Sequence, residues 1–229
     1  MTWSIALISP VVDTGLVDVE SFIAPLRSNR CMIENHFLQH GPSSIETKAD
    51  EEACLPDLYR VAAELDAKGF DAIIINCMCD PGVDALQASL STPVLGPAKM
   101  AMHAAAALGR RFAFLDVVAD AREEMFDLAA RYGLATAMVS HRAIDAHVLD
   151  LQSDAEHTLS ALEAQSILAV EEDGAQAVLL GCTLLADFAQ PLSQRLVRRG
   201  LNVSVIEPVA VTVHAACAML DAGAIRGDR

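Results

Sequence analysis

No uninterrupted apolar run in the 229-residue sequence approaches the roughly 20 residues that a helix needs to span a bilayer. The longer apolar stretches are interrupted by Asp, His or Gly. The amino terminus, Met1-Thr-Trp-Ser-Ile-Ala-Leu-Ile, also lacks the basic start and long apolar stretch of a signal peptide. We therefore expect a cytoplasmic protein with no membrane-spanning helix.

Basic residues are scarce. The chain has 16 Lys and Arg against 31 Asp and Glu, a net charge of −15, and this charge repels nucleic acid and anionic membrane surfaces. The densest basic cluster is Arg195, Arg198 and Arg199, which has the spacing of a solvated helix face. Hydrophobic residues make up 53% and charged residues 21%, which predicts a compact globular protein rather than a disordered one. We expect no nucleic-acid partner and no membrane partner.

Motifs for a nucleotide or a metal are missing too. The sequence has no Gly-x-Gly-x-x-Gly and no Walker sequence, so nucleotide binding lacks support. Cys77-Met-Cys79 forms a Cys-x-Cys, but no second cysteine pair or His-x-x-His accompanies it, so a zinc site is poorly supported. The six cysteines are expected to be mostly reduced in a cytoplasmic chain. We predict no cofactor and no metal.

Short apolar runs alternate with helix-length amphipathic segments. The runs do not alternate polar and apolar residues, which predicts strands buried on both faces of a parallel sheet and an α/β fold. The expected strands are Ile5–Ser9, Ala72–Asn76, Val94–Leu95, Phe112–Leu115, Ala177–Leu180 and Val203–Ile206. The expected helices are Asp50–Lys68, Asp84–Leu90, Ala98–Leu108, Ala121–Tyr132, Asp154–Asp173, Leu184–Arg199 and Val209–Ala222.

The chain contains an internal repeat. Gly69-Phe-Asp-Ala-Ile-Ile-Ile-Asn-Cys77 matches Gly174-Ala-Gln-Ala-Val-Leu-Leu-Gly-Cys182 at an offset of 105 residues. Two further matches have offsets of 107 and 111 residues: Ile5-Ala-Leu-Ile with Phe112-Ala-Phe-Leu, and Pro97 to His103 with Pro208 to His214. Chance likeness among Ala-rich segments is the alternative. We expect two similar Rossmann-like lobes related by pseudo-twofold symmetry, residues 1–97 plus 209–229 and residues 98–208, with an active site in the cleft between them.

Cys77 and Cys182 each follow a predicted buried strand, where ligands bind in open α/β sheets. After Cys77, the residues Met-Cys-Asp-Pro-Gly predict a turn and then a helix start, whose free backbone N–H groups favour a thiolate or a bound carbonyl. One such cysteine is more often a small core residue. Two at equivalent points of a repeat favour an acid and a base that face each other.

The chain resembles a known group, the cofactor-independent aspartate/glutamate/hydantoin racemase superfamily. The resemblance covers nearly the whole chain in the family's order and is greatest for the hydantoin and allantoin racemase branch. The motifs that carry it are Gly41-Pro-Ser-Ser-Ile-Glu46, Asn76-Cys-Met-Cys-Asp-Pro-Gly82, Leu108-Gly-Arg-Arg-Phe112, Glu172-Asp-Gly-Ala and Leu180-Gly-Cys-Thr183.

The resemblance implies a reaction at a carbon next to a carbonyl. Cys77 and Cys182 would be the catalytic pair, one as thiolate base and the other as thiol acid. A small-molecule substrate, such as a hydantoin-like ring or an amino acid, is implied, and so is a homo-oligomer. The resemblance also implies substrate-binding roles: backbone N–H groups near Met78, Cys79, Thr183 and Leu184 around the developing oxyanion, the side chain of Asn76, and the loops at Pro10 and Ser44.

Departures from the family pattern leave the substrate open. Of the family's usual first loop, this sequence keeps only Pro10. Asp116 stands where a Thr is usual and is expected to lie near the pocket mouth. Cys79 replaces the usual Asp or Gly, and Thr183 replaces the usual Ala. Two alternatives therefore remain. One is a decarboxylase or cis-trans isomerase of small dicarboxylates on the same fold, and the other is a non-catalytic small-molecule binding protein.

Other polar and thiol groups are expected to be structural. We expect His36 and His40 on a surface helix and His141 and His147 in loops. Small buried thiols are expected at the remaining cysteines, Cys31, Cys54 and Cys217.

Overall fold

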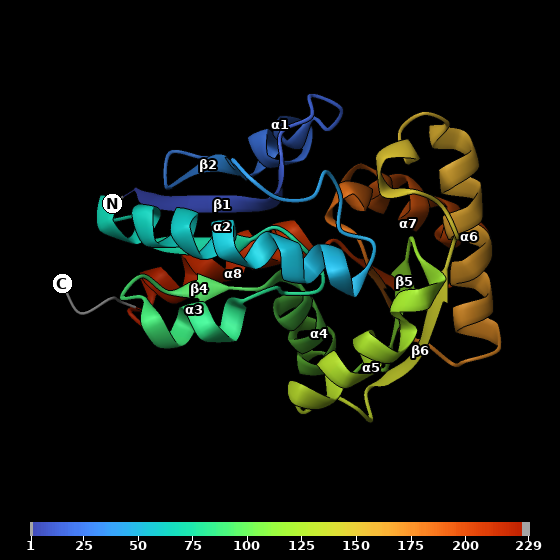
Figure 1. Cartoon of the computed structure of the whole chain (residues 1–229). Coiled ribbons are helices and arrows are strands. Elements are labelled where there is room, and N and C mark those ends of the chain that lie inside the picture. Colours follow the sequence, from blue (N-terminus) through green and yellow to red (C-terminus); the bar gives the residue numbers. More distant parts are fainter. Residues whose placement is uncertain (1, 226–229) are drawn as a thin grey trace. The chain divides into compact units, whose positions relative to one another are not determined.

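The computed structural model describes residues 2–225 (Figure 1). The chain divides into two compact units. Of the described residues, unit 1 comprises 2–100 and 209–225, and unit 2 comprises 101–208. Unit 1 is therefore made from both ends of the chain, because the last helix returns to it.

Each unit is built on a four-stranded parallel sheet, which confirms the predicted α/β class. The strand order is β2-β1-β3-β4 in unit 1 and β6-β5-β7-β8 in unit 2, so the two sheets have the same topology. The strands are β1 (Trp3–Val12), β2 (Cys31–Leu38), β3 (Ala72–Ile75), β4 (Val94–Leu95), β5 (Phe112–Asp116), β6 (Met138–Ala143), β7 (Ala177–Leu180) and β8 (Ser204–Ile206).

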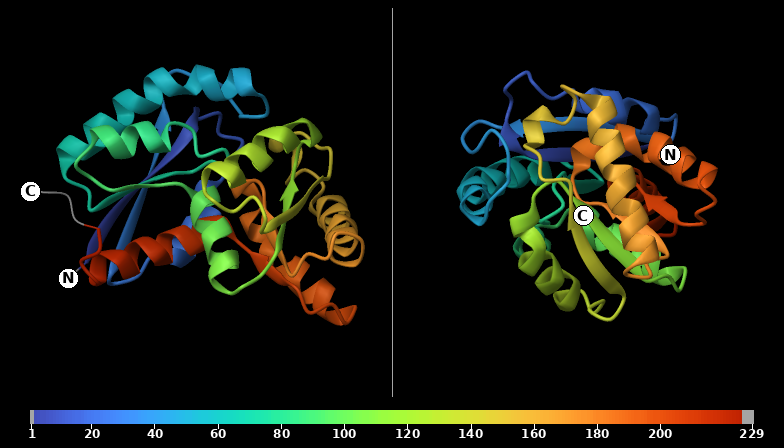
Figure 2. Two further views of the ribbon diagram at one scale, coloured as in Figure 1. Left: turned by 90° about the horizontal axis from the view of Figure 1, so that it is seen from below. Right: turned by 90° about the vertical axis from the view of Figure 1, so that its right-hand side faces the viewer.

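Helices pack on both faces of the unit 1 sheet. The helices are α1 (Val19–Ile23), α2 (Lys48–Lys68), α3 (Val83–Ser89), α4 (Pro97–Ala107), which runs into unit 2, and α8 (Pro208–Asp221). One face of β1 and β3 forms a hydrophobic core with α2 and α3. α2 and α8 lie on opposite sides of β1 and β2 (Figure 2, left). Burial on both faces explains why β3, Ala-Ile-Ile-Ile, has no alternating pattern.

Local signals define the ends of the longest helix of unit 1. Thr47 and Asp50 form a capping box at the start of α2, where each side chain accepts a hydrogen bond from the other residue's backbone N–H. Gly69 ends α2 in the left-handed conformation, at a φ of 80°, which glycine adopts without steric cost. β3 follows directly, so these caps set where the strand that leads to Cys77 begins.

Unit 2 repeats this plan with its own helices. They are α5 (Arg122–Arg131), α6 (Ala155–Glu171) and α7 (Ala189–Arg198), with the short 3-10 helices Ala119–Ala121, Val148–Asp150 and Thr183–Phe188. One hydrophobic cluster joins β5 and β7 to α6 and α7. A small cluster of Ala113, Ala169 and Ala175 with Val139 lets the carboxyl-terminal part of α6 approach the sheet closely.

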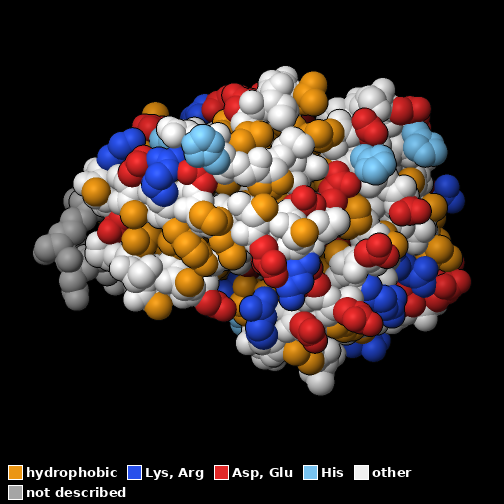
Figure 3. All heavy atoms as spheres, in the orientation of Figure 1, with side chains coloured by type: hydrophobic (Ala, Val, Ile, Leu, Met, Phe, Trp, Pro, Cys, Tyr) orange, Lys and Arg blue, Asp and Glu red, His pale blue; other side chains and the backbone are white. Residues whose placement is uncertain are grey.

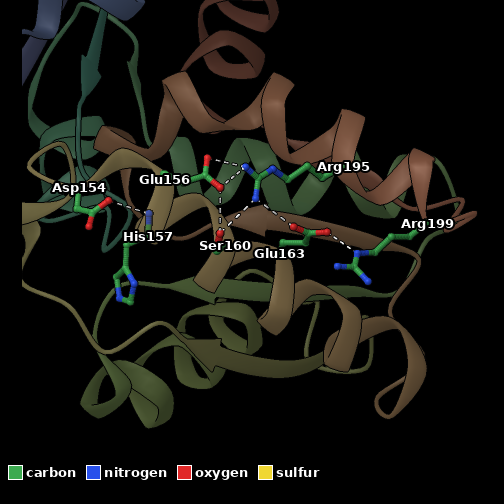
Figure 4. A network of polar contacts seen from close by, with 7 residues as sticks. All are labelled: Asp154, Glu156, His157, Ser160, Glu163, Arg195 and Arg199. Atoms are coloured by element: carbon green, nitrogen blue, oxygen red, sulfur yellow. Dashed lines mark hydrogen bonds and ion pairs between the residues drawn. The ribbon is translucent and has the colours of Figure 1, made fainter.

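Ion pairs join α6 to α7 on the surface of unit 2 (Figure 4). Arg195 donates to both carboxylate oxygens of Glu156 at 2.7 Å and to Glu163 at 3.2 Å, and Arg199 also pairs with Glu163. On the face drawn in Figure 3, basic and acidic side chains are likewise interspersed. Within residues 2–225, no helix is both long and apolar enough to cross a membrane.

The main differences from the sequence-based expectations are two strands, the short helix α1 and one helix start. β2 and β6 were not expected, because polar residues interrupt their apolar runs. The helix predicted to begin at Leu184 begins at Ala189, after the 3-10 helix Thr183–Phe188. His36 lies in β2 and His40 just after it, so the prediction of a surface helix for these two residues was wrong. His141 lies in β6, so the prediction that it lies in a loop was also wrong.

Candidate functional site

The first candidate segment is the turn after β3, which carries Cys77. The ladder between β1 and β3 continues one residue beyond β3, because the Asn76 N–H donates to the Ile8 carbonyl at 2.8 Å. The chain then turns: the Cys77 N–H donates to the Ile75 carbonyl at 2.8 Å, and the Asp80 N–H to the Cys77 carbonyl at 3.1 Å. Cys77 and Cys79 are partly exposed, whereas Met78 is buried between them. The turn therefore carries two partly exposed cysteines, and the buried side chain of Met78 holds it against the core.

Asp80 fixes this turn to the start of α4. Its carboxylate accepts hydrogen bonds from the backbone N–H groups of Ala98 at 3.0 Å and Lys99 at 2.9 Å. These are orphan donors of the first helical turn, and a carboxylate there is also favoured by the helix dipole. Gly96 makes room for the contact, because a Cβ on it would lie 2.3 Å from the Asp80 carboxyl carbon. Asp-Pro-Gly predicts a turn, and the structure adds this capping role for Asp80.

Beside Cys77, three neutral polar side chains form a row across the ends of adjacent strands. Asn76 donates from its amide to the Ser9 hydroxyl at 3.2 Å, and Ser9 donates to the Asn35 side-chain oxygen at 2.8 Å. Ser9 and Asn76 are buried. The row connects β3 through β1 to the edge strand β2, so it holds the residue before Cys77 to the rest of the sheet.

The second candidate segment follows β7 and carries Cys182. The Gly181 N–H donates to the Leu115 carbonyl at 2.7 Å, and the Leu185 N–H donates to the Cys182 carbonyl at 3.0 Å. Cys182 precedes the 3-10 helix Thr183–Phe188 and is partly exposed, as is Leu184, while Thr183 is buried. Cys182 therefore occupies in unit 2 the position that Cys77 occupies in unit 1, at the carboxyl end of the equivalent strand.

Gly181 is held against β5 so closely that no side chain fits. A Cβ on Gly181 would lie 2.7 Å from the Phe114 ring and 2.9 Å from both the Asp116 Cα and the Leu115 carbonyl oxygen. Real Cβ atoms do not approach other heavy atoms to this extent, and two of these three neighbours are backbone atoms. The residue before Cys182 must therefore be glycine for β7 to keep its present distance from β5.

A buried ionisable pair lies across this end of the unit 2 sheet. The Nε2 atom of His141 lies 3.1 Å from one carboxylate oxygen of Asp116, and the other oxygen accepts from the Val117 N–H at 2.7 Å. The His141 ring stacks on Phe114 with an interplanar angle of 11°. Asp116, whose negative charge was expected near a pocket mouth, is buried against His141.

The remaining predicted residues of unit 1 lie on neighbouring segments. Pro10 follows Ser9 in β1 and is buried. Ser44 lies in the loop after β2, is partly buried, and donates to the Glu46 carboxylate at 3.1 Å. The Val12 N–H donates to the Pro42 carbonyl at 3.0 Å, which ties this loop to the end of β1. Unit 1 thus holds Pro10, Ser44, Asn76, Cys77, Met78 and Cys79, and unit 2 holds Cys182, Thr183 and Leu184.

Other cysteines differ from these in their surroundings. Burial raises the pKa of the Cys54 thiol to about 12, and this thiol donates to the Glu51 carbonyl at 3.1 Å. Burial also raises the pKa of the Cys31 thiol to about 12, and its side-chain hydrogen bond with Cys217 is the second cause. Thiols with such pKa values carry almost no thiolate near neutrality, so Cys31 and Cys54 are poor nucleophiles and bases. Among residues 2–225, no group of three or more His, Cys, Asp or Glu is arranged to hold a metal ion.

Sequence reasoning missed Ser9, Asn35 and His141. Strand register is the signal that identifies them. Asn35 pairs with Leu7 and therefore lies diagonally across from Ser9, two residues after Leu7. In the same way, His141 pairs with Phe114 and lies diagonally across from Asp116. The polar pairs Ser9–Asn35 and Asp116–His141 therefore occupy equivalent places in the two sheets.

Comparisons with known proteins agree with this architecture. The family model described as Asp/Glu/Hydantoin racemase matches residues 23–216. A hydantoin racemase from Pseudomonas sp. (strain NS671) is 33% identical over 183 residues, which cover 80% of this chain and 72% of that protein.

Two solved structures share the fold. An allantoin racemase from Klebsiella pneumoniae has a TM-score of 0.88 at 25% identity, with 99% of this chain and 91% of that chain covered. An allantoin racemase from Pseudomonas fluorescens has a TM-score of 0.89 at 22% identity, with 98% and 93% covered. The match of the family model over most of the chain confirms the resemblance seen in the motifs, and the chain belongs to the Asp/Glu/hydantoin racemase family.

Proposed function

We propose that this protein is a cofactor-independent racemase or epimerase in which Cys77 and Cys182 act on the two faces of one carbon next to a carbonyl. Membership of the family implies an isomerase with a small-molecule substrate. The proposed substrates are hydantoin-like rings, such as hydantoin and allantoin, or amino acids. The relatives named hydantoin racemase and allantoin racemase support the ring compounds.

The equivalence of the two cysteine turns carries the proposal. Cys77 and Cys182 are both partly exposed, each directly follows a buried residue, and each lies at the carboxyl end of the same strand of its sheet. Open α/β sheets bind ligands at this edge. Buried thiols elsewhere, at Cys31 and Cys54, have pKa values raised to about 12 and are unsuited to proton transfer.

The proposed reaction transfers one proton to the enzyme and one back to the substrate. The thiolate of one cysteine takes the proton from the carbon, and the electron pair of the C–H bond moves into an enolate-like system. The thiol of the other cysteine then donates its proton to the opposite face, which inverts the carbon. Turnover leaves the two protonation states exchanged, and proton exchange with water or the reverse reaction restores them.

Neighbouring groups have proposed supporting roles. Backbone N–H groups near Met78, Cys79, Thr183 and Leu184 stabilise the developing oxyanion, and preorganised donors of this kind provide a large part of catalysis. Asn76 is proposed to orient Cys77 or the ligand; its amide donates to Ser9, which holds this buried residue beside the turn. Pro10 and Ser44 are proposed to line the pocket.

Hydrogen–deuterium exchange in D2O tests the proposal, because it reports proton abstraction whatever the final product is. Enantiopure hydantoins, allantoin and free amino acids are incubated with the enzyme, and both deuterium at the reacting carbon and optical rotation are measured. We expect deuterium incorporation together with loss of optical rotation for at least one class. Release of carbon dioxide without racemisation would instead favour a decarboxylase.

The variants Cys77→Ser and Cys182→Ser are each expected to lower racemisation by a factor of about 1000 or more, because the serine hydroxyl is far less acidic than a thiol. Cys217→Ala is the matched control: this cysteine lies in α8, is also partly buried, and has no role in the proposed reaction. A single-serine variant that racemises the substrate at the wild-type rate would exclude the two-base mechanism.

A further inference from the structure

Two cysteines away from the two cysteine turns lie against each other in unit 1. Cys31 begins the edge strand β2, and Cys217 lies in α8, 186 residues further along the chain. Both are free thiols, and a side-chain hydrogen bond joins them. A disulfide requires two cysteines whose side chains point at each other, and this contact meets that requirement.

The burial pattern along β2 agrees with this placement. Cys31 and Ile33 are buried, whereas Met32 and Glu34 are exposed, so this part of the strand has one covered face and one face open to solvent. α8 and α2 lie on opposite sides of β1 and β2 (Figure 2, left). The covered face is that of α8, because Cys31 contacts Cys217 there.

Polar contacts one helical turn beyond Cys217 hold α8 to the same strand ends. The Asp221 carboxylate accepts hydrogen bonds from the Trp3 indole at 2.9 Å and from the Arg30 guanidinium at 2.7 Å. Asp221 comes four residues after Cys217 and therefore lies on the same side of the helix. Trp3 pairs with Cys31 in the sheet, and its N–H donates to the Arg30 carbonyl at 2.9 Å. The helix is thus fixed to the strand at two successive turns.

We propose that Cys31 and Cys217 form a redox modification site, at which a low-molecular-weight disulfide such as oxidised glutathione converts the two thiols into an intramolecular disulfide. This disulfide covalently joins α8 to β2, and so joins the two stretches of chain that make up unit 1. The inference goes beyond the proposed function and does not rest on it, because neither cysteine takes part in the proposed reaction.

The exchange proceeds in two balanced steps. Cys217, the more exposed of the two, attacks oxidised glutathione as a thiolate; the S–S bond of the reagent breaks, a mixed disulfide forms, and one glutathione leaves. Cys31 then attacks the sulfur of Cys217, forms the protein disulfide and releases the second glutathione. The two protein thiols lose two electrons and two protons, and the reagent takes these up as two molecules of reduced glutathione.

Burial slows the second step but does not prevent it. Because the pKa of the Cys31 thiol is raised, its thiolate is scarce near neutrality. The target sulfur is held beside it, however, and well-oriented groups within one molecule react as if present at on the order of 10⁵ M or more. The mixed disulfide is therefore resolved by the neighbouring thiol rather than by glutathione from solution.

Disulfide mapping tests the inference without any substrate. The protein is equilibrated with oxidised and reduced glutathione, free thiols are blocked with N-ethylmaleimide, and tryptic digests are analysed by mass spectrometry without a reductant. Trypsin releases residues 31–48 and 200–226 as peptides with one cysteine each, so the cross-link has a defined mass. At one glutathione ratio, we expect the equilibrium constant for the cross-link to be at least about 100-fold larger in the native protein than in urea.

Cysteine variants show whether the cross-link is specific. Cys217→Ser should abolish it and leave Cys31 reduced. Cys54→Ser is the matched control: this thiol is also buried but donates to the Glu51 carbonyl, so its loss should leave the cross-link unchanged. Circular dichroism confirms that each variant is folded, and the comparison of native and unfolded wild type needs no variant at all.

A third variant tests the polar contacts that hold α8. Asp221→Ala removes the acceptor for Trp3 and Arg30, so the equilibrium constant should fall about three- to tenfold. Glu52→Ala, which removes an exposed carboxylate from α2, should leave the constant unchanged. Equal constants in Asp221→Ala and the wild type would overturn the role given to Asp221.

Amide hydrogen exchange measures what the cross-link does to the fold. A disulfide between distant residues restricts the unfolded chain, so in the oxidised wild type the amides of α8 should exchange at least about tenfold more slowly than in the reduced protein. Oxidised Cys217→Ser should show no such change, and the amides of α6 in unit 2 are the internal reference.

The outcomes separate the inference from the proposed function. A native protein that stops at the mixed disulfide on Cys217, or that cross-links no more readily than the chain in urea, would overturn the inference even if the enzyme racemises hydantoins. A protein that forms the cross-link but exchanges no substrate proton would uphold the inference and reject the racemase proposal.

Discussion

The two cysteine turns occupy equivalent places in two sheets of the same topology, yet they are held by different means. In unit 1, a side chain does the holding: the Asp80 carboxylate binds the first N–H groups of α4, and Gly96 leaves it room. In unit 2, backbone packs on backbone: Gly181 lies against Leu115 and Asp116 with no space for a side chain. The first arrangement can adjust when disturbed, whereas the second cannot.

This difference bears on how each thiol is positioned. A turn anchored by one carboxylate keeps its position through two hydrogen bonds, each worth about 1–3 kcal/mol because the acceptor is charged. A turn held by close packing keeps its position because its backbone atoms are in van der Waals contact with those of the neighbouring strand. We therefore expect the Cys182 turn to be the less tolerant of substitution and the Cys77 turn to respond to polar changes.

The largest effect is expected from Gly181→Ala. The added Cβ would meet the Asp116 Cα, the Leu115 carbonyl and the Phe114 ring at less than 3.0 Å, so β7 must move away from β5. We expect the free energy of unfolding to fall by about 3 kcal/mol, the upper part of the range for overpacked cores. Gly96→Ala should cost about 1–2 kcal/mol, because its Cβ meets the Asp80 carboxylate, which can swing away and lose its hydrogen bonds. Urea denaturation followed by circular dichroism measures both.

A double-mutant cycle checks the reason for the smaller cost. In the background of Asp80→Ala, the obstacle to a side chain at Gly96 is gone, so Gly96→Ala should become nearly neutral. Gly200→Ala serves as the control for backbone conformation: this glycine has a φ of 79° and no atom within 4 Å of the added Cβ, so it should cost about 1 kcal/mol by strain alone. Equal costs for Gly181→Ala and Gly200→Ala would contradict the packing argument.

A middle-sized effect is expected from Ser9→Ala in the neutral row. The substitution removes the acceptor for the Asn76 amide and the donor to Asn35, so both hydrogen bonds of this partly buried row are lost. We expect a loss of about 1–2 kcal/mol of unfolding free energy. Because the row holds the residue before Cys77, the alkylation rate of Cys77 should change while that of Cys182 stays the same. Ser153→Ala, at an exposed serine of unit 2, is the control and should leave both the stability and the Cys77 rate unchanged.

The sequence indicates the central strands, the two cysteines and their neighbours along the chain, but not the polar partners that the edge strands contribute. β3 and β7 were predictable because Ala-Ile-Ile-Ile and Ala-Val-Leu-Leu have no polar positions. The edge strands β2 and β6 were not, since Asn35 and His141 interrupt their apolar pattern. These two residues are nevertheless the partners of Ser9 and Asp116, over separations of 26 and 25 residues. Such pairs depend on strand register, which local composition does not encode.

Asp116 is a second example of a residue whose partner could not be predicted from the sequence. Its position at the end of a predicted strand suggested the edge of the sheet where ligands bind in open α/β folds. Its negative charge was expected near the pocket mouth. The partner, His141, lies on the unpredicted strand β6 and stacks on Phe114. The charge was thus located by sequence, whereas its burial and its partner required the fold.

The smallest effect is expected at Asp173. This residue binds Arg142 of β6, and β6 lies on the other side of β5 from β7, the strand that leads to Cys182. The hydrogen bond from Arg142 lowers the pKa of this carboxyl below its usual value, and burial opposes the shift in part. Because the folded pKa is below the unfolded value, the contribution to stability is complete above about pH 4–5 and is lost as the pH falls through the lowered pKa. We expect Asp173→Asn to lower the unfolding free energy by less than about 1 kcal/mol at pH 7 and by nearly nothing at pH 2. Urea denaturation at the two pH values measures the difference, and Glu172→Gln, whose carboxylate is far more exposed, should have the weaker effect of the two.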